Sequence, residues 1–153
     1  MFIEIINILL ISMSPVVELR GSIPFAILSY NFPVWLALLV SVVGNVIPPL
    51  FLIPIISRAG ALLSDRSNLW QRMFAHALQK TRDNHEKKFE ILKEFTLVVL
   101  VAIPLPFTGV WTASLASYVF GIPFRKAILL ISLGVILAGI IVTLVTIGLV
   151  SIF

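Results

Sequence analysis

Two long and four short apolar segments alternate along the chain. The long segments, residues 33–57 and 124–151, exceed the roughly 20 apolar residues that a helix needs to cross a hydrocarbon core about 30 Å thick. The short segments cover residues 1–13, 22–32, 95–103 and 109–121. As helices, the first two would reach only about 20 Å and about 16 Å. The pattern therefore predicts two membrane-crossing helices and two pairs of helices that are too short to cross alone.

Helix-breaking residues separate the two members of each short pair. Pro15 and Gly21 lie in the first break with Pro24 just beyond it, and Pro104 and Pro106 lie in the second, IPLPFTG. Proline lacks an amide donor and disfavours helix at the preceding residue, so each pair should fold back as a hairpin. Non-helical backbone at membrane depth persists only inside protein or beside a water-filled cavity, which favours two re-entrant hairpins plus two full spans. A four-helix bundle with short, tilted first and third helices is the alternative.

The two halves of the chain correspond when the sequence is shifted by 90 residues. Without a gap, this shift superposes Ala26 on Ala116, Pro33 on Pro123, Ala37 on Ala127, Leu39 on Leu129 and Gly44 on Gly134. Because each half crosses once, the halves must have opposite orientations, as in transporters built from inverted repeats whose broken helices meet near the midplane. We predict an all-α membrane protein with a single domain, 1–153, made of repeat 1 (1–57), a linker (58–94) and repeat 2 (95–153).

The distribution of charge predicts the orientation. Charged residues make up 12% of the chain and hydrophobic residues 59%, whereas about a quarter of a typical soluble domain is charged. Of the eleven Lys and Arg residues, eight lie in the linker, Arg125 and Lys126 begin the last span, and Arg20 stands apart. The positive-inside rule makes the linker cytoplasmic and puts both termini outside. Because the basic residues are confined to one segment of a membrane-like chain, no nucleic-acid partner is expected.

The linker itself is expected to be helical. Apolar residues recur there at helical spacing and predict an amphipathic helix on the inner membrane surface: Leu69, Trp70, Met73, Phe74, Ala77 and Leu78. Asp83 followed by Glu86 resembles a capping box and predicts a helix that leads into the second hairpin. His76 and His85 lack further ligands at metal-site spacing, so we interpret them as solvated or interfacial residues.

Glu18 and Arg20 lie at the predicted turn of the first hairpin, where Gly21 permits close approach of the backbone. An ionisable group at the centre of a membrane helix costs about 2.5 kcal/mol or more, and such groups mostly face a cavity and serve function. In the alternative interpretation both residues lie at the outer interface, paired with each other or with lipid headgroups. The other outward loops carry no charge, which favours a site.

The second break offers a facing site. The stretch PLPFTGVWT places Thr108 and Gly109 directly before a short helix, whose free amides and partial positive charge suit an anion or a polar group. Ser22 and Pro24 are expected to open the corresponding limb of the first hairpin. Small residues at 113, 114, 116 and 117 permit close helix packing, and packing alone is the alternative for that stretch.

Three motifs resemble the small multidrug export protein family over nearly the whole chain: ELRGSIP at 18–24, GNxxP at 44–48 and PLPFTGVWT at 104–112. More distantly, that family is similar to DedA-like (VTT domain) membrane proteins. There, acidic and arginine residues on opposed re-entrant hairpins are linked to proton-dependent movement of a lipid carrier phosphate. The resemblance implies a transporter or flippase of a prokaryotic-type cytoplasmic membrane. Within these motifs and the hairpins, we predict a substrate site at Arg20, Ser22, Thr108, Gly109, Trp111 and Thr112, and a helix break or support at Gly44, Asn45 and Pro48.

We interpret Glu18 as a proton carrier. A carboxyl group in a poorly hydrated pocket takes up a proton more readily, and a neighbouring arginine opposes that uptake. If an anionic group of a substrate engages Arg20, Glu18 loses its partner and protonates more easily. This predicts a proton-coupled secondary transporter or exporter of a small amphiphilic or anionic substrate at a site between the hairpins. The alternatives are a lipid-carrier phosphate flippase of the DedA-like type and a non-transporting membrane assembly subunit.

Enzymatic activity is not expected. Both aspartates and both histidines lie in the linker, away from the hairpins, and the chain has no cysteine to serve as a nucleophile or thiolate ligand. We therefore expect no cofactor and no metal. The expected partners are the lipid bilayer, protons and a small amphiphilic or lipid-phosphate substrate. Since two full spans enclose little space, we also expect a homodimer or a larger homo-oligomer.

Overall fold

The computed structural model describes residues 1–64, 86–103 and 109–152, and these parts of the chain form helices and no strands. The helices are α1 (Phe2–Met13), α2 (Glu18–Tyr30), α3 (Val34–Ser64), α5 (Glu86–Ala102), α6 (Val110–Val119) and α7 (Phe124–Ile152). The all-helical class predicted from the apolar pattern is confirmed for these residues. The predicted linker helix over 69–78, the capping residue Asp83 and both histidines lie outside the described residues.

The two long helices, α3 and α7, form the centre of the molecule and pack against each other. With 31 and 29 residues, they are about 46 Å and about 43 Å long, more than a hydrocarbon core requires. Val34–Ala59 and Phe124–Ser151 are apolar enough throughout to cross a membrane. Their outward side chains, such as Leu39, Phe51 and Leu144, are exposed and apolar, a surface that suits lipid better than water.

Helix α3 departs from the prediction in two respects. It continues to Ser64 instead of ending at 57, which shortens the linker. It also runs without a break through Gly44, Asn45 and Pro48. The prediction of a helix break at these residues is therefore wrong, and of the two roles predicted for them only support of the site remains. Prolines are tolerated inside membrane helices because neighbouring helices and polar side chains re-satisfy the freed carbonyls.

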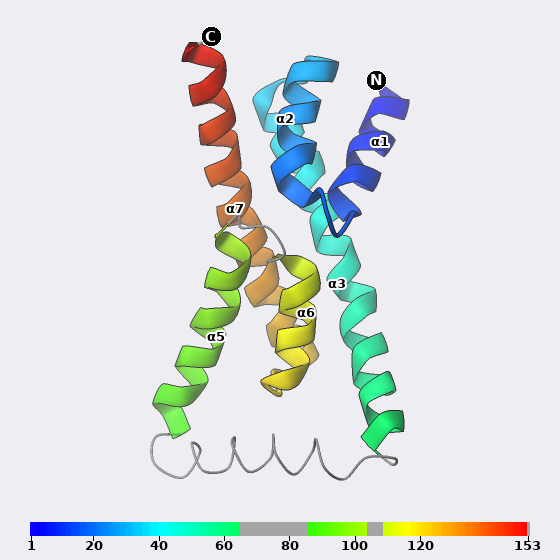
Figure 1. Ribbon diagram of the computed structural model, residues 1–153, viewed down its shortest axis with the longest axis vertical. Coiled ribbons are helices and arrows are strands. Elements are labelled where there is room, and N and C mark those ends of the chain that lie inside the picture. The colour runs from blue at the N-terminus through cyan, green and yellow to red at the C-terminus, as the bar shows by residue number, and fades with distance from the viewer. Residues whose placement is uncertain (65–85, 104–108, 153) are drawn as a thin grey trace.

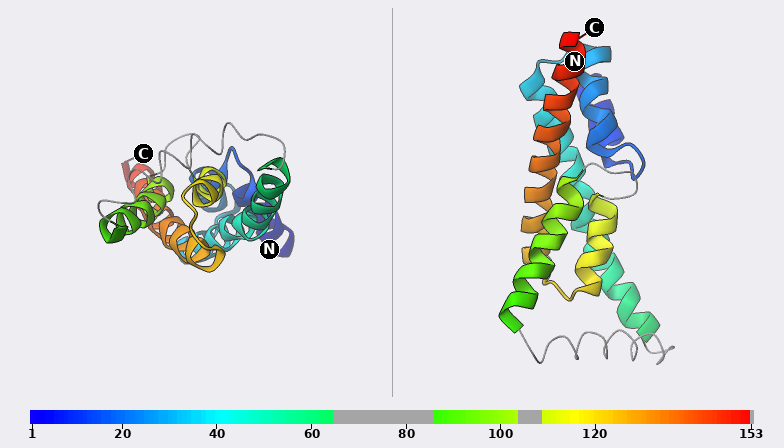
Figure 2. Two further views of the ribbon diagram at one scale, coloured as in Figure 1. Left: turned by 90° about the horizontal axis from the view of Figure 1, so that it is seen from below. Right: turned by 60° about the vertical axis from the view of Figure 1, so that its left-hand side comes forward.

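The short helices form two hairpins at opposite ends of the molecule (Figure 1). From the end that holds both termini, α1 runs to the middle, the chain turns over residues 14–17, and α2 returns. From the other end α5 runs to the middle and α6 returns beside it. The turned view shows the inner ends of α1 and α2 facing the inner ends of α5 and α6 at mid-length (Figure 2), and we call these inner ends the tips of the two hairpins. Helices of 12 and 13 residues are only about 18–20 Å long, so α1 and α2 each extend only between one end of the molecule and its middle.

One hairpin limb, α2, begins elsewhere than predicted. Ser22 and Pro24 do not open the second limb but lie inside α2, which starts at Glu18. The reason is that helical hydrogen bonds form earlier, from Glu18 N–H to the Ser14 carbonyl and from Gly21 N–H to the Val17 carbonyl. Helix α5, in contrast, begins at Glu86 and continues into the apolar segment 95–103, which agrees with the helix predicted from the Asp83–Glu86 spacing to lead into the second hairpin.

Glycines ninety residues apart fix each hairpin to a long helix. A Cβ on Gly44 of α3 would lie 2.9 Å from the Leu9 carbonyl oxygen of α1, and a Cβ on Gly134 of α7 would lie 2.9 Å from the Val98 carbonyl oxygen of α5. Real Cβ atoms do not approach so closely, so only glycine fits at either position. The first limb of each hairpin is thus packed against a long helix in the same manner.

Candidate functional site at the meeting of the hairpin tips

Glu18 is the acidic residue at the tip of the first hairpin, and it is almost fully buried, with 6% of its surface exposed. Its backbone has a φ of +47°, a left-handed conformation that is uncommon for residues other than glycine. Such strain persists only where the surroundings enforce it, and it is concentrated at functional sites. The turn at 14–17 and the first turn of α2 therefore hold this carboxyl group in a specific direction.

The carboxylate of Glu18 points at the beginning of α6 in the opposite hairpin. It accepts a hydrogen bond from the backbone N–H of Val110, the first residue of α6. Gly109, which precedes it, has no side chain to cap the helix, so Glu18 supplies from another hairpin the acceptor that an N-cap side chain normally provides. The helix terminus also carries a partial positive charge, which favours a carboxylate at this place.

Gly109 is required at this contact for two reasons. Its φ of 143° and ψ of −159° belong to a region that is essentially restricted to glycine. In addition, a Cβ at this position would overlap the Glu18 carboxylate. The close approach of the two tips therefore depends on a residue without a side chain.

Arg20 lies beside Glu18 on α2. Its Nη2 atom is 3.7 Å from Glu18 Oε2, which is an ion pair but longer than a good hydrogen bond. About a quarter of the Arg20 side chain is exposed. The guanidinium group therefore lies between the buried carboxylate and the surface.

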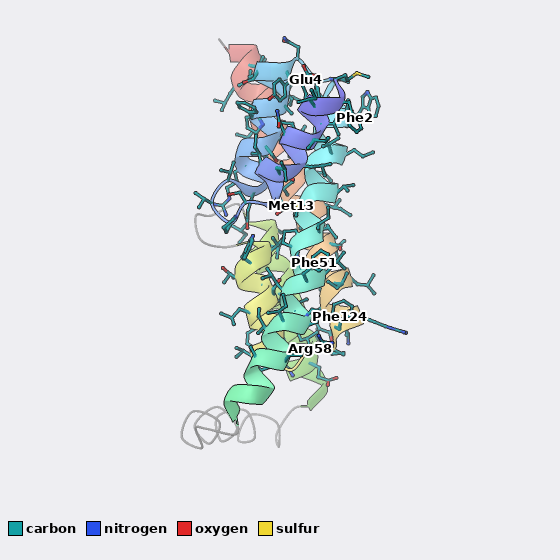
Figure 3. All side chains as sticks on the ribbon, turned by 90° about the vertical axis from the view of Figure 1, so that its right-hand side faces the viewer. Phe2, Glu4, Met13, Phe51, Arg58 and Phe124 are labelled. Carbon is teal, nitrogen blue, oxygen red and sulfur yellow. The ribbon has the colours of Figure 1, made fainter. Side chains whose placement is uncertain are left out.

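A second hydrogen bond joins the tips. Trp111 Nε1 of α6 donates to the Met13 carbonyl at the end of α1, over 3.3 Å. Viewed from the side, Met13 lies near the middle of the molecule, between Glu4 at one end and Arg58 toward the other (Figure 3). Both tip contacts therefore lie deep in the molecule, far from either end.

Two hollows adjoin Arg20. The smaller, about 10 Å³, is lined by Glu18, Leu19, Arg20, Asn45, Val101, Ala138 and Val142. The larger is an apolar groove of about 350 Å³ between α2 and the last part of α7, which falls in the size range of small-molecule sites. Its walls are Arg20, Pro24, Leu28, Ile141, Val142, Val145, Thr146, Leu149 and Val150. An apolar groove with one cation on its wall matches the chemistry of an amphiphilic anion.

Most of the predicted site residues that the structure describes gather here. Glu18, Arg20, Gly109 and Trp111 meet at the tips, and Asn45 lines the smaller hollow. Ser22 is buried one turn above Glu18. Thr112 is exposed on α6 and lines neither hollow. Thr108, Pro104 and Pro106 lie outside the described residues.

Sequence reasoning missed the Val110 N–H, the Met13 carbonyl and the groove wall on α7. The first two are backbone groups, which every residue carries, so no sequence signal distinguishes them. Thr146, a polar residue in the last span, could have pointed to the groove. Its hydroxyl, however, donates to the Val142 carbonyl in its own helix, as threonines in membrane helices that line no site also do.

Comparison with family models matches residues 18–141 to the family described as "Putative small multi-drug export protein". The match covers most of the chain and contains Glu18, Arg20, Asn45 and Gly109. Neither the curated proteins nor the solved structures contain a match to this chain.

Proposed function

We propose that this chain, which belongs to the small multi-drug export protein family, is a proton-coupled membrane transporter or exporter that moves a small amphiphilic anion. Membership of the family and two long apolar helices indicate a membrane protein. The observation that carries the proposal is the Glu18–Arg20 pair, held where the tips of two opposed hairpins meet.

In the proposed membrane arrangement, α3 and α7 cross the bilayer and the two hairpins enter it from opposite faces as re-entrant segments. The equivalent packing of Gly44 and Gly134 supports an inverted repeat. Arg58 lies toward the end opposite the termini (Figure 3), and the other basic residues of the linker follow it in sequence. By the positive-inside rule, we infer that this end is cytoplasmic and that both termini are outside.

Coupling would depend on competition for Arg20. In the resting state the guanidinium pairs with the Glu18 carboxylate. The anionic group of a substrate binds Arg20 in place of Glu18, while its apolar part lies in the groove between α2 and α7. Glu18, now buried without its cation, takes a proton from water and becomes neutral. A lipid-linked phosphate is one member of this substrate class, since the groove suits a hydrocarbon chain. A homodimer would complete the enclosure that two spans lack.

Transport by purified protein in proteoliposomes tests this proposal. With a pH gradient and a panel of amphiphilic anions, the wild type should drive uphill movement of at least one compound. Glu18→Gln removes the titrating group at nearly constant size, so gradient-driven transport should vanish. Glu4→Gln is the matched control, because Glu4 is a partly exposed glutamate that pairs with the N-terminal amine, away from the hairpin tips. Gradient-driven transport by Glu18→Gln at the wild-type rate would refute the proposal.

A further inference from the structure

Three buried polar atoms in the described parts of the chain have no hydrogen-bond partner: Ser22 Oγ, Ser41 Oγ and Asn45 Oδ1. Leaving a buried polar group unpaired destabilises a protein, and such groups in native folds are normally satisfied by protein or by ordered water. Ser114 and Ser117 are equally buried but bond to carbonyls of their own helix, α6. The three unpaired groups therefore need an explanation.

The register of α2 against α3 brings these groups together. The two helices are antiparallel (Figure 1). Glu18 and Asn45 line the same small hollow, and Ala26 and Ala37 belong to the same hydrophobic cluster. Ser22 lies one turn from both Glu18 and Ala26, and Ser41 lies one turn from both Asn45 and Ala37. The two serines are therefore opposite each other, directly above Glu18 and Asn45, on the side of the termini.

The hollow at the lower end of this column has the dimensions of a water site. Its volume of about 10 Å³ corresponds to roughly one water molecule. Pro48 and Pro49 add acceptors beside it, because they have no N–H to donate to the carbonyls of Gly44 and Asn45. A carboxylate and an amide thus line the hollow, and the two unpaired hydroxyls lie one helical turn beyond them.

Packing alone does not require these polar residues. The positions ninety residues after Ser41 and Asn45 are Ile131 and Val135, on α7. Both are fully buried in the main hydrophobic cluster. The corresponding face of the second long helix is therefore filled by apolar side chains, whereas the first carries a hydroxyl and an amide.

We infer that Glu18, Asn45, Ser22 and Ser41 hold a short row of ordered waters through which Glu18 exchanges its proton on the side of the molecule where both termini lie. The inference rests on the proposed role of Glu18 and adds the route of its proton. Each water accepts a proton on one side and passes another to its neighbour, and the last proton goes to the carboxylate. Arg20 is the other charged residue on the hollow.

Infrared spectroscopy of the purified protein tests the row without any substrate. The carbonyl band of protonated Glu18 is identified by its loss in Glu18→Gln. This band shifts when the buffer is changed to D2O and the carboxyl proton is replaced by deuterium. The rate of the shift measures how readily Glu18 exchanges its proton with the solvent. Ser22→Ala and Ser41→Ala should each slow it about tenfold, the factor that corresponds to one lost hydrogen bond. Ser117→Ala removes an equally buried but internally bonded hydroxyl and should leave the rate unchanged.

The melting temperature distinguishes hydroxyl groups that are bonded to ordered water from hydroxyl groups that have no partner. If the hydroxyls are dry and unpaired, Ser22→Ala and Ser41→Ala remove a penalty and raise the melting temperature. If waters bind them, the melting temperature stays constant or falls. Raised melting temperatures with an unchanged exchange rate would overturn the inference and leave the role of Glu18 intact. A Glu18 band that is missing at every pH would contradict the proposed function itself.

Discussion

Gly109→Ala is the substitution whose effect follows most directly from the structure. The backbone angles at 109 lie in a region essentially restricted to glycine, so a side chain there costs about 1–3 kcal/mol. The new Cβ would also overlap the Glu18 carboxylate. That carboxylate is the end of a flexible side chain and can move away, but it then loses the Val110 N–H, a charged hydrogen bond worth about 1.5–3 kcal/mol. Together the two effects predict a destabilisation of about 4 kcal/mol.

Two other glycines provide controls for this value. Gly121 also has a positive φ, +66°, but a Cβ there would meet nothing within 4 Å. Gly121→Ala should therefore cost only the left-handed strain, about 1 kcal/mol. Gly148 is helical and likewise open, so Gly148→Ala should be neutral or stabilise α7 by up to about 1 kcal/mol.

The free energy of unfolding, measured by denaturant titration in detergent micelles with circular dichroism, gives the comparison. The double variant Gly109→Ala with Glu18→Ala removes the overlap but keeps the backbone strain. Its destabilisation should be smaller than the sum of the two single effects by about 1–3 kcal/mol. Equal effects of Gly109→Ala and Gly121→Ala, or additive effects in the double variant, would refute the close contact between the tips.

Three further predictions concern orientation and the tip contacts. The chain has no cysteine, so a single introduced cysteine can be labelled specifically. Cysteines introduced in residues 64–90 should be labelled only from the cytoplasm, and those at either terminus only from outside. Labelling of the two termini from opposite faces would contradict the inverted repeat. Arg20→Gln leaves the buried carboxylate without its cation and should destabilise the protein by about 2 kcal/mol, less than a fully buried pair because Arg20 is partly exposed. Adding Glu18→Gln should recover much of that loss without restoring transport, and an equally unstable double variant would argue against the pair. Trp111→Phe removes the hydrogen bond to the Met13 carbonyl and should lower the free energy of unfolding by about 1 kcal/mol. A free energy of unfolding equal to that of the wild type in denaturant titration would show that this bond does not stabilise the protein.

The long helices and the positions of the hairpins could be predicted from the sequence because they depend on local properties. Apolar runs of sufficient length specify α3 and α7, and proline and glycine clusters mark where the short helices separate. Predictions of exact boundaries were less accurate. The first turn of α2 closes on carbonyls of the preceding turn, which moved its start ahead of Ser22 and Pro24. In α3, three internal prolines failed to end the helix, because packing against α1, α2, α6 and α7 outweighs local propensity.

The candidate site was only partly predictable for a different reason. Glu18 and Arg20 stand out as charges in an apolar segment, so composition alone identifies them. Their partners depend on contacts between distant segments: a backbone amide of α6, and Asn45 on α3. The placement of Ser22 relative to Ser41 depends on the register of two helices, which no local pattern in either segment encodes.

The number of protons that the protein takes up when it binds substrate tests the central claim most directly. Detergent-solubilised protein in weakly buffered solution near neutral pH is mixed with an amphiphilic anion identified in the transport panel, and the pH change is recorded. If the anion displaces Glu18 from Arg20, binding should be accompanied by uptake of up to one proton per chain in the wild type and by none in Glu18→Gln. Binding without proton uptake by the wild type, or equal uptake by Glu18→Gln, would contradict the account.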